Sequence, residues 1–280
     1  MQTFINILAL KKRLAVIRKE NASIGFVPTM GALHEGHISL IRESVKNNDY
    51  TICSIFVNPT QFNNKEDLLK YPRTKEKDIG MLKEVWTDIL FFPDVKEIYP
   101  DNQDADFDVD LEGIDKLWEG EFRPGHFKGV VQVVKIFLDI IEPDTLYMGQ
   151  KDFQQFTIIK LMLKKTKSNV KLIVVPTMRE TDGLAMSSRN VRLNPEFRKK
   201  SVVLFKALNF AKENLNILPI DIIESKALDM IVDANLKPEY FKLVDTEKLE
   251  PIVKVDDVKT VAIVAAWAGD VRLIDNMILN

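Results

Sequence analysis

Two histidines that stand three residues apart are the strongest chemical signal in the chain. His34 and His37 are two of only 3 histidines among 280 residues, and glycines at positions 31 and 36 flank them. An apolar run, Ile24 to Val27, predicts a strand just before them, and a helical pattern begins directly after them at Ile38. Both imidazoles are therefore predicted to lie at a helix amino terminus, where N–H groups and the helix dipole favour phosphate. Such donors suit nucleotidyl transfer, because they stabilise charge that grows on phosphate in the transition state.

Three other interpretations of this segment compete with phosphate binding. The spacing of its glycines imitates a Walker A loop, but His37 and Ile38 stand where that motif requires Lys and Ser or Thr. His34-Glu35-Gly36-His37 has the wrong spacing for a metalloprotease helix, and a lone cysteine offers no thiolate cluster for zinc. The third is a hydrogen-bonded pair of surface histidines without a chemical role, which the flanking glycines and the strand-to-helix position disfavour.

Two further clusters carry groups that suit phosphate. The hydroxyls and guanidinium of the run Ser187 to Arg189 could donate to phosphate oxygens, although the run is equally typical of a helix-capping turn before Pro195. Gly149-Gln150-Lys151-Asp152 follows a predicted strand, at the edge where doubly wound sheets bind ligands. Lys151 could reach a phosphate, and Asp152 either accepts from ribose hydroxyls or caps the next helix.

Neutral amides form the next group, since they can hold hydroxyls and carboxylates without adding charge. Asn58 and Gln61 follow the apolar run Thr51 to Val57, and Gln154 and Gln155 open the helical segment after residue 152. The third histidine lies in Arg123-Pro124-Gly125-His126-Phe127, which is either a substrate loop or a helix entry.

The elements that must position these groups alternate along the first part of the chain. Short apolar runs predict strands at Ile24–Val27, Thr51–Val57, Ile89–Phe92, Thr145–Met148 and Leu172–Val175. Helical periodicity predicts helices at Ile38–Lys46, Glu76–Val85, Val130–Ile141 and Phe153–Lys165. This alternation predicts an α/β fold with a Rossmann-like, doubly wound parallel sheet.

The pattern changes after Pro176, where helices precede strands. Helical stretches are predicted at about Pro195–Asn214 and Ile220–Asn235, and strands at Tyr240–Val244, Thr260–Ala266 and Val271–Ile274. We therefore predict two domains, a nucleotide-binding domain over residues 1–176 and a smaller α+β lid domain over residues 177–280. The acidic stretch Asp101 to Asp110 is interpreted as a solvated loop, not a metal site.

The composition limits the kinds of partner that the protein is expected to bind and the cellular compartment in which it is expected. With 39 Lys plus Arg against 41 Asp plus Glu, the net charge of -2 argues against nucleic acid and favours a small-molecule partner. No run of about 18 uncharged apolar residues predicts a membrane span, and no secretory leader is recognisable. The single cysteine, Cys53, excludes an internal disulfide. We expect a cytoplasmic protein.

Four segments together resemble the pantothenate synthetases, a family of pantoate–β-alanine ligases. They are Pro28-Thr29-Met30-Gly31-Ala32-Leu33-His34-Glu35-Gly36-His37, Asn58-Pro59-Thr60-Gln61-Phe62, Gly149-Gln150-Lys151-Asp152-Phe153-Gln154-Gln155 and Asp182-Gly183-Leu184-Ala185-Met186-Ser187-Ser188-Arg189-Asn190. Tyr71-Pro72-Arg73-Thr74 and the segment from 123 to 127 add shorter matches, and the final third is less distinctive. The resemblance implies a Rossmann-like fold, a small second domain and a homodimer.

The resemblance also implies which residues bind ATP. They form three groups, Met30, Gly31, Ala32, Leu33, His34, Glu35, Gly36 and His37, then Gly149, Gln150, Lys151 and Asp152, then Met178, Met186, Ser187, Ser188 and Arg189. His34 and Lys151 would contact phosphate, His37 would be the proton donor, and Met178 would contact adenine through its backbone. The catalytic set implied is His37, His34, Lys151 and Arg189.

For the other substrates, the resemblance assigns Gln61 and Gln155 to pantoate. It assigns Gln61 and Asn58 to β-alanine, with Arg189 beside the β-alanine site. Two residues depart from the family pattern. Gln150 stands where many members have Glu, and Leu69 stands where an acidic residue is common, which bears on a loop or metal contact near the substrate mouth. No side chain is assigned as a metal ligand.

The implied reaction begins when the pantoate carboxylate attacks the α-phosphorus of Mg²⁺-bound ATP, giving pantoyl adenylate and pyrophosphate. The β-alanine amine then attacks the acyl carbon and expels AMP. Two alternatives stay open at this point, a transferase of the same fold that uses CTP and a catalytically silent nucleotide sensor. A tRNA-binding fragment is disfavoured by the near-neutral charge.

Overall fold

The computed structural model describes residues 1–100, 107–255 and 258–280. Most of the acidic stretch interpreted above as a solvated loop lies outside these ranges, and its last four residues, 107–110, form no helix or strand. The chain forms two compact units, which we call the first unit (residues 1–149 and 158–176) and the second unit (residues 150–157 and 177–280). The predicted functional division at residue 176 stays a prediction; in the structure, residues 150–157 pack with the second unit.

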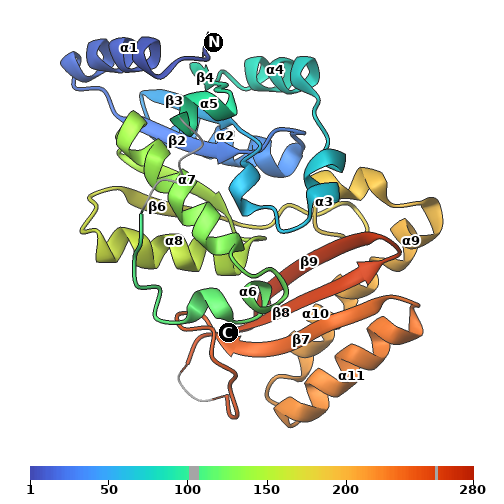
Figure 1. Ribbon diagram of the computed structural model, residues 1–280. Coiled ribbons are helices and arrows are strands. Elements are labelled where there is room, and N and C mark those ends of the chain that lie inside the picture. The colour runs from blue at the N-terminus through green and yellow to red at the C-terminus, as the bar shows by residue number, and fades with distance from the viewer. Residues whose placement is uncertain (101–106, 256–257) are drawn as a thin grey trace. The chain divides into compact units, whose positions relative to one another are not determined.

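The first unit is built on a six-stranded, wholly parallel sheet with the strand order β1-β4-β3-β2-β5-β6 (Figure 1). Its strands are β1 (Gln2–Phe4), β2 (Ile24–Thr29), β3 (Tyr50–Ile55), β4 (Ile89–Phe91), β5 (Thr145–Gly149) and β6 (Lys171–Val175). The order reverses direction at β2, as in a doubly wound fold. The predicted Rossmann-like parallel sheet is confirmed.

Helices cover both faces of this sheet. They are α1 (Ile7–Lys19), α2 (Glu35–Asn47), α3 (Lys65–Lys70), α4 (Lys75–Glu84), α5 (Val95–Ile98), α6 (Glu119–Phe122), α7 (His126–Ile141) and α8 (Phe153–Lys165), with single 3₁₀ turns η1 (Pro59–Gln61) and η3 (Ile114–Lys116). Crossovers between parallel strands are right-handed, which places α2 and α4 on one face and α1 and α7 on the other. Contacts of α2 with α4, and of α1 with α7, agree with this arrangement.

Alternating side chains of the strands fill the two faces. On the α2 face, Val27, Cys53 and Leu90 of adjacent strands pack in one buried cluster with Ile41 and Leu82 of the helices. On the opposite face the ring of Phe137, from α7, meets Phe26, Phe56 and Phe91 edge to face. Strands buried on both faces read as continuous apolar runs, which is why the sequence predicted them well.

The second unit carries an antiparallel sheet of three strands, β7 (Lys237–Asp245), β8 (Thr260–Ala268) and β9 (Val271–Ile278). Its other elements are η4 (Ser188–Arg192), α9 (Pro195–Lys200), α10 (Val203–Asn214) and α11 (Ile220–Asp233). Leu208 and Ile223, from the two longer helices, share a buried core with Phe241 and Val264 of the sheet. The predicted smaller α+β part of the chain is confirmed.

Two elements differ from the sequence prediction. The edge strand β1 was missed, because it has three residues with largely exposed side chains and no apolar run. The helix predicted over Pro195–Asn214 is interrupted at Ser201, whose hydroxyl donates to the carbonyl of Phe197 at 2.6 Å. Serine can bond the preceding turn in this way and so competes with continued helix.

Among the described residues, no helix is long and apolar enough to cross a membrane. The same residues contain no cluster of three or more His, Cys, Asp or Glu side chains arranged to hold a metal ion.

The reactivity of the Cys53 thiol provides a test of the packing of the first unit. It is fully buried, and burial raises its pKa to about 12. The reactive thiolate should therefore be almost absent at mildly alkaline pH. We expect Ellman's reagent to label only a small fraction of the folded protein and one thiol per chain in guanidinium. Rapid labelling of the folded protein would contradict this packing.

Candidate active site

The histidine pair lies at the amino terminus of α2, as predicted. His34 is the N-cap residue, and its Nδ1 accepts a hydrogen bond from the backbone N–H of Gly36 at 3.1 Å. The rings of His34 and His37 are stacked at a tilt, with centroids 4.1 Å apart and an angle of 42° between their planes. The helix start thus presents two imidazoles together after the carboxyl end of β2.

The capping hydrogen bond determines which ring nitrogen of neutral His34 carries the hydrogen. An Nδ1 atom that accepts a hydrogen bond carries no proton, so the neutral ring bears its hydrogen on Nε2. His34 therefore has a structural role as a helix cap and also offers one N–H donor. Sequence reasoning foresaw the helix start but did not foresee that an imidazole would cap it.

The loop that leads into α2 is held by a buried carboxylate. Asp78, on α4, accepts hydrogen bonds from the backbone N–H groups of Ala32 and Leu33 at 2.9 and 2.8 Å. It also accepts from the hydroxyl of Thr74 at 2.9 Å. Gly31 and Ala32 both have positive φ, 81° and 49°, a conformation that is strained for alanine. The two bonds from Asp78 hold the chain in that turn.

These bonds change the expected chemistry of the segment. The sequence predicted that unpaired backbone N–H groups would face an anion, but Ala32 and Leu33 donate to Asp78, and Gly36 donates to His34. Fewer backbone N–H groups of this segment are therefore available to an anion than the sequence predicted. Sequence reasoning missed Asp78, because one acidic residue in a chain with 29% charged residues resembles any solvated helix face.

A second turn of the first unit carries Gln61. Its side chain is 7% exposed, and its Nε2 donates to the sulfur of Met30 at 3.1 Å. The structure thus brings together two of the predicted substrate-binding segments, the histidine loop and the turn η1.

Asn58 holds this turn in place. Its Oδ1 caps η1 and also accepts from the hydroxyl of Tyr99 at 2.9 Å. Its Nδ2 donates to Gln61 Oε1 at 3.2 Å and to the carbonyl of Gly129 at 3.1 Å. Because its amide makes all these internal bonds, Asn58 positions Gln61; the β-alanine contact assigned to it stays a prediction.

The third histidine belongs to the same assembly. Nε2 of buried His126 lies 3.1 Å from the guanidinium of Arg123, which can only donate, so Nε2 must accept. Nδ1 then carries the proton and donates to the backbone carbonyl of Gln61 at 2.8 Å. The helix-entry interpretation is confirmed, since His126 begins α7, and the residue also anchors the Gln61 turn. The substrate-loop interpretation stays a prediction.

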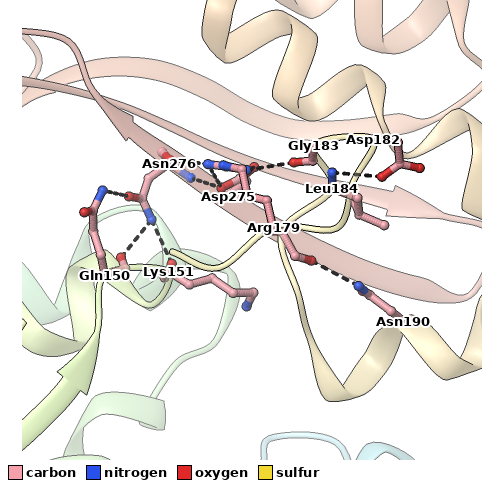
Figure 2. A network of polar contacts seen from close by, with 10 residues as sticks. Gln150, Lys151, Arg179, Asp182, Gly183, Leu184, Asn190, Asp275 and Asn276 are labelled. Atoms are coloured by element: carbon pink, nitrogen blue, oxygen red, sulfur yellow. Dashed lines mark hydrogen bonds and ion pairs between the residues drawn. The ribbon is translucent and has the colours of Figure 1, made fainter. Parts of the chain in front are cut away.

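The remaining predicted site residues lie in the second unit, apart from Gly149, which ends β5. Figure 2 shows Gln150 and Lys151 bonded to Asn276, next to the pair formed by Arg179 and Asp275. Asp152 provides the carbonyl that accepts from Phe156 in the first turn of α8. Gln155 lies in that same turn.

The segment from Met178 to Arg189 forms a hairpin that ends in a capped turn. The backbone N–H of Met186 donates to the carbonyl of Met178 at 3.0 Å, and residues 179 and 185 form an antiparallel bridge. Ser187 caps η4, its hydroxyl accepting from the N–H of Arg189 at 3.3 Å. Ser187 thus caps a short 3₁₀ helix and not the helix that begins at Pro195, whose N-cap is Asn194. The phosphate roles of Ser187, Ser188 and Arg189 stay predictions.

The turn of the hairpin carries an ion pair. Asp182 accepts from Arg198 at 2.7 and 3.2 Å, and this bonding lowers the pKa of the Asp182 carboxyl. The carboxyl is therefore ionised at neutral pH, and it also accepts from the N–H of Leu184.

The fold and these groups define a class of protein. Doubly wound parallel sheets are typical of nucleotide-binding α/β proteins, which bind ligands beyond the carboxyl ends of their strands, and the paired imidazoles follow one such end. Comparison with known proteins narrows the class: the model of the pantoate-beta-alanine ligase family matches residues 2–278. The chain belongs to that family. It is therefore a ligase that joins pantoate to β-alanine, with ATP as a substrate.

Individual relatives are similar over their whole length. The chain is 45% identical to a pantothenate synthetase of Azobacteroides pseudotrichonymphae, over 99% of both chains, and 42% identical to one of Thermosipho africanus, over 100% of both. A crystal structure of pantothenate synthetase from Thermus thermophilus has a TM-score of 0.91 at 37% identity, covering 100% of this chain and 99% of that one. A pantoate-beta-alanine ligase from Francisella tularensis, complexed with beta-gamma ATP and beta-alanine, has a TM-score of 0.84 at 38% identity, covering 99% and 97%.

The contact between α7 and η1 can be tested through Gly129. A Cβ at this position would lie 2.6 Å from the carbonyl oxygen of Thr60 and 2.8 Å from the nitrogen of Gln61. Gly129→Ala should therefore displace the Gln61 turn. We expect a loss of about 1–3 kcal/mol in the free energy of unfolding, measured in urea, and a raised KM for pantoate.

Gly80→Ala is the matched control, because a Cβ there meets nothing within 4 Å and the residue lies inside α4. That change should stabilise the helix by about 0.5–1 kcal/mol and leave the KM for pantoate unchanged. Equal effects of the two substitutions would show that the close approach at Gly129 is unimportant.

Proposed function

We propose that this ligase joins pantoate to β-alanine in two steps, through a pantoyl adenylate. In the first step a carboxylate oxygen of pantoate attacks the α-phosphorus of ATP, and the bond to the β-phosphate oxygen breaks, releasing pyrophosphate. In the second step the amine of β-alanine attacks the acyl carbon, loses a proton and displaces AMP. No protein nucleophile is required in either step.

The observation that carries this proposal is the histidine pair at the start of α2. Two imidazoles with centroids 4.1 Å apart follow the carboxyl end of a central parallel strand, beside the turn that holds Gln61. Their N–H donors suit the charge that grows around the α-phosphorus and on the leaving pyrophosphate. In this proposal His34 and His37 contact the phosphates, and His37 is the proton donor.

The other roles are proposed from the resemblance and the chemistry of each group. Lys151 and Arg189 neutralise phosphate charge, with Ser187 and Ser188 beside them, and Met178 contacts adenine through its backbone. Gln61 and Gln155 bind pantoate, and Gln61 borders β-alanine. The carboxylate of pantoate and the triphosphate of ATP repel one another. The chief role of these cations and donors is to offset that repulsion and to align the two anions for reaction.

The proposal extends to the metal, the assembly and the compartment. We propose that Mg²⁺ enters with ATP, bound through the phosphates, since no cluster of acidic or histidine ligands occurs in the described ranges. We also propose a homodimer in the cytoplasm, in which residues 177–280 act as the lid of the nucleotide-binding domain formed by residues 1–176.

The reaction can be tested by following AMP release with pantoate, β-alanine and ATP, and then omitting each in turn. AMP should require all three, whereas pyrophosphate should be released with pantoate and ATP alone. His37→Ala should lower pyrophosphate release by about 10²-fold, because it removes a donor at the phosphates.

Lys46→Ala, an exposed change in the last turn of the same helix, controls for effects on α2 itself. Full adenylate formation by His37→Ala would contradict the assigned role. Turnover with CTP, or ATP binding without pyrophosphate exchange, would instead support the transferase or the sensor.

The two roles of His34 can be separated by the choice of substitution. His34→Asn keeps a good N-cap, whereas His34→Ala removes the cap and should cost about 1 kcal/mol of folding stability. Both lose the Nε2–H donor, so both should lose about 10²-fold in turnover. Thermal melting and steady-state rates measure the two effects. An active His34→Asn enzyme would limit His34 to capping.

A further inference from the structure

The side chain of Asn276, on β9, makes three hydrogen bonds to the turn formed by Gln150 and Lys151. Nδ2 of Asn276 donates to the backbone carbonyls of Gln150 and Lys151 at 3.0 and 2.8 Å, and Oδ1 accepts from Gln150 Nε2 at 3.2 Å (Figure 2). Asn276 is 2% exposed. Both N–H donors and the oxygen of its amide are thus bonded to this one turn, which precedes α8.

The neighbouring residue, Asp275, fixes the backbone that carries Asn276. Its Oδ1 accepts from the N–H of Asn276 at 2.7 Å, and its two oxygens accept from Arg179 at 2.6 and 3.0 Å. Burial raises the pKa of the Asp275 carboxyl, while the Arg179 guanidinium opposes that shift. A bidentate ion pair of this kind fixes both the distance between the guanidinium and the carboxylate and their relative orientation.

Arg179 extends the connection to the hairpin. Its guanidinium also donates to the carbonyls of Gly183 and Asn276 at 3.1 and 3.2 Å, and it lies 4.5 Å from the ring centroid of Phe205. Figure 2 shows Arg179 of the hairpin beside Gly183 and beside Asp275 and Asn276 of β9. The hairpin ends in the capped turn from Ser187 to Arg189.

We infer that Asn276 is a positioning residue for Lys151, which it holds in register with the hairpin that carries Ser187 to Arg189. The ammonium of Lys151 and the groups of the hairpin are then presented to ATP as one preassembled set, and ATP does not have to order them separately. This inference rests on the proposed ATP-binding roles of these residues. Asn276 itself touches no substrate in this scheme.

The same contact involves Gln150, a residue that departs from the family pattern. Gln150 stands where the resemblance leads to Glu, and its amide donates to Oδ1 of Asn276. A carboxylate at position 150 cannot donate, and Asn276 cannot turn its amide over without facing its oxygen toward two carbonyls. Gln150 and Asn276 therefore form a matched pair, and Gln150→Glu should weaken the anchor without disturbing β9.

The test compares Asn276→Ala with Ile278→Thr, an exposed change two residues along the same strand. Asn276→Ala should raise the Kd for ATP, measured by calorimetry, and the KM for ATP by roughly tenfold, as expected for two lost hydrogen bonds to backbone carbonyls. The KM for pantoate should stay close to that of the Ile278→Thr control, whereas the melting temperature should fall below it, because the carbonyls of Gln150 and Lys151 lose a buried partner. Gln150→Glu should shift ATP binding in the same direction and by less.

A double-mutant cycle with Lys151→Ala distinguishes positioning from general structural support. If Asn276 acts through Lys151, Asn276→Ala should have little further effect on the Kd for ATP once Lys151 is removed. Multiplicative losses, or an equal rise in the KM for pantoate, would overturn the inference. If the wild-type enzyme binds ATP but forms no AMP, the proposed function is wrong. The double-mutant cycle still tests the role of Asn276 in that case, because its readout is ATP binding.

Discussion

The buried carboxylate of Asp78 is the contact on which the first unit's site depends. Two consecutive residues with positive φ, Gly31 and Ala32, would not stay in that turn by local preference alone, because alanine is strained there. Bonds from the N–H groups of Ala32 and Leu33 to Asp78 offset the strain. The direction in which α2 begins, and so the placement of both imidazoles, follows from a residue more than forty positions away in the sequence.

Both units use the same physical device. In each, a loop that carries chemical groups is fixed by side chains from another element, which bond to its backbone. Asp78 does this for the histidine loop, His126 for the Gln61 turn, and Asn276 for the turn at Lys151. Such bonds fix the Cα positions of the loop, which is the preorganisation that electrostatic catalysis requires.

This arrangement also assigns the chemistry to side chains. Most helix starts that bind phosphate do so through backbone N–H groups, but here Asp78 and His34 accept from several of those groups. In the two-step reaction proposed above, directed imidazole donors, an ammonium and a guanidinium stabilise the charge of the triphosphate. Such groups can be placed around a phosphorus where charge develops, which suits a reaction between two anions.

The sequence by itself determined the parallel sheet, the smaller antiparallel part, the helix start at the histidines and the family. These features rest on local signals, namely apolar runs buried on both faces, glycines at a turn and contiguous motifs. Only the tertiary structure showed that His34 is a cap, that Asn58 and His126 hold Gln61, and that Asp78 and Asn276 anchor the loops. The reason is that a buried polar side chain is defined by partners distant in sequence, such as residue 276 for residue 151, and no local pattern records such a pairing.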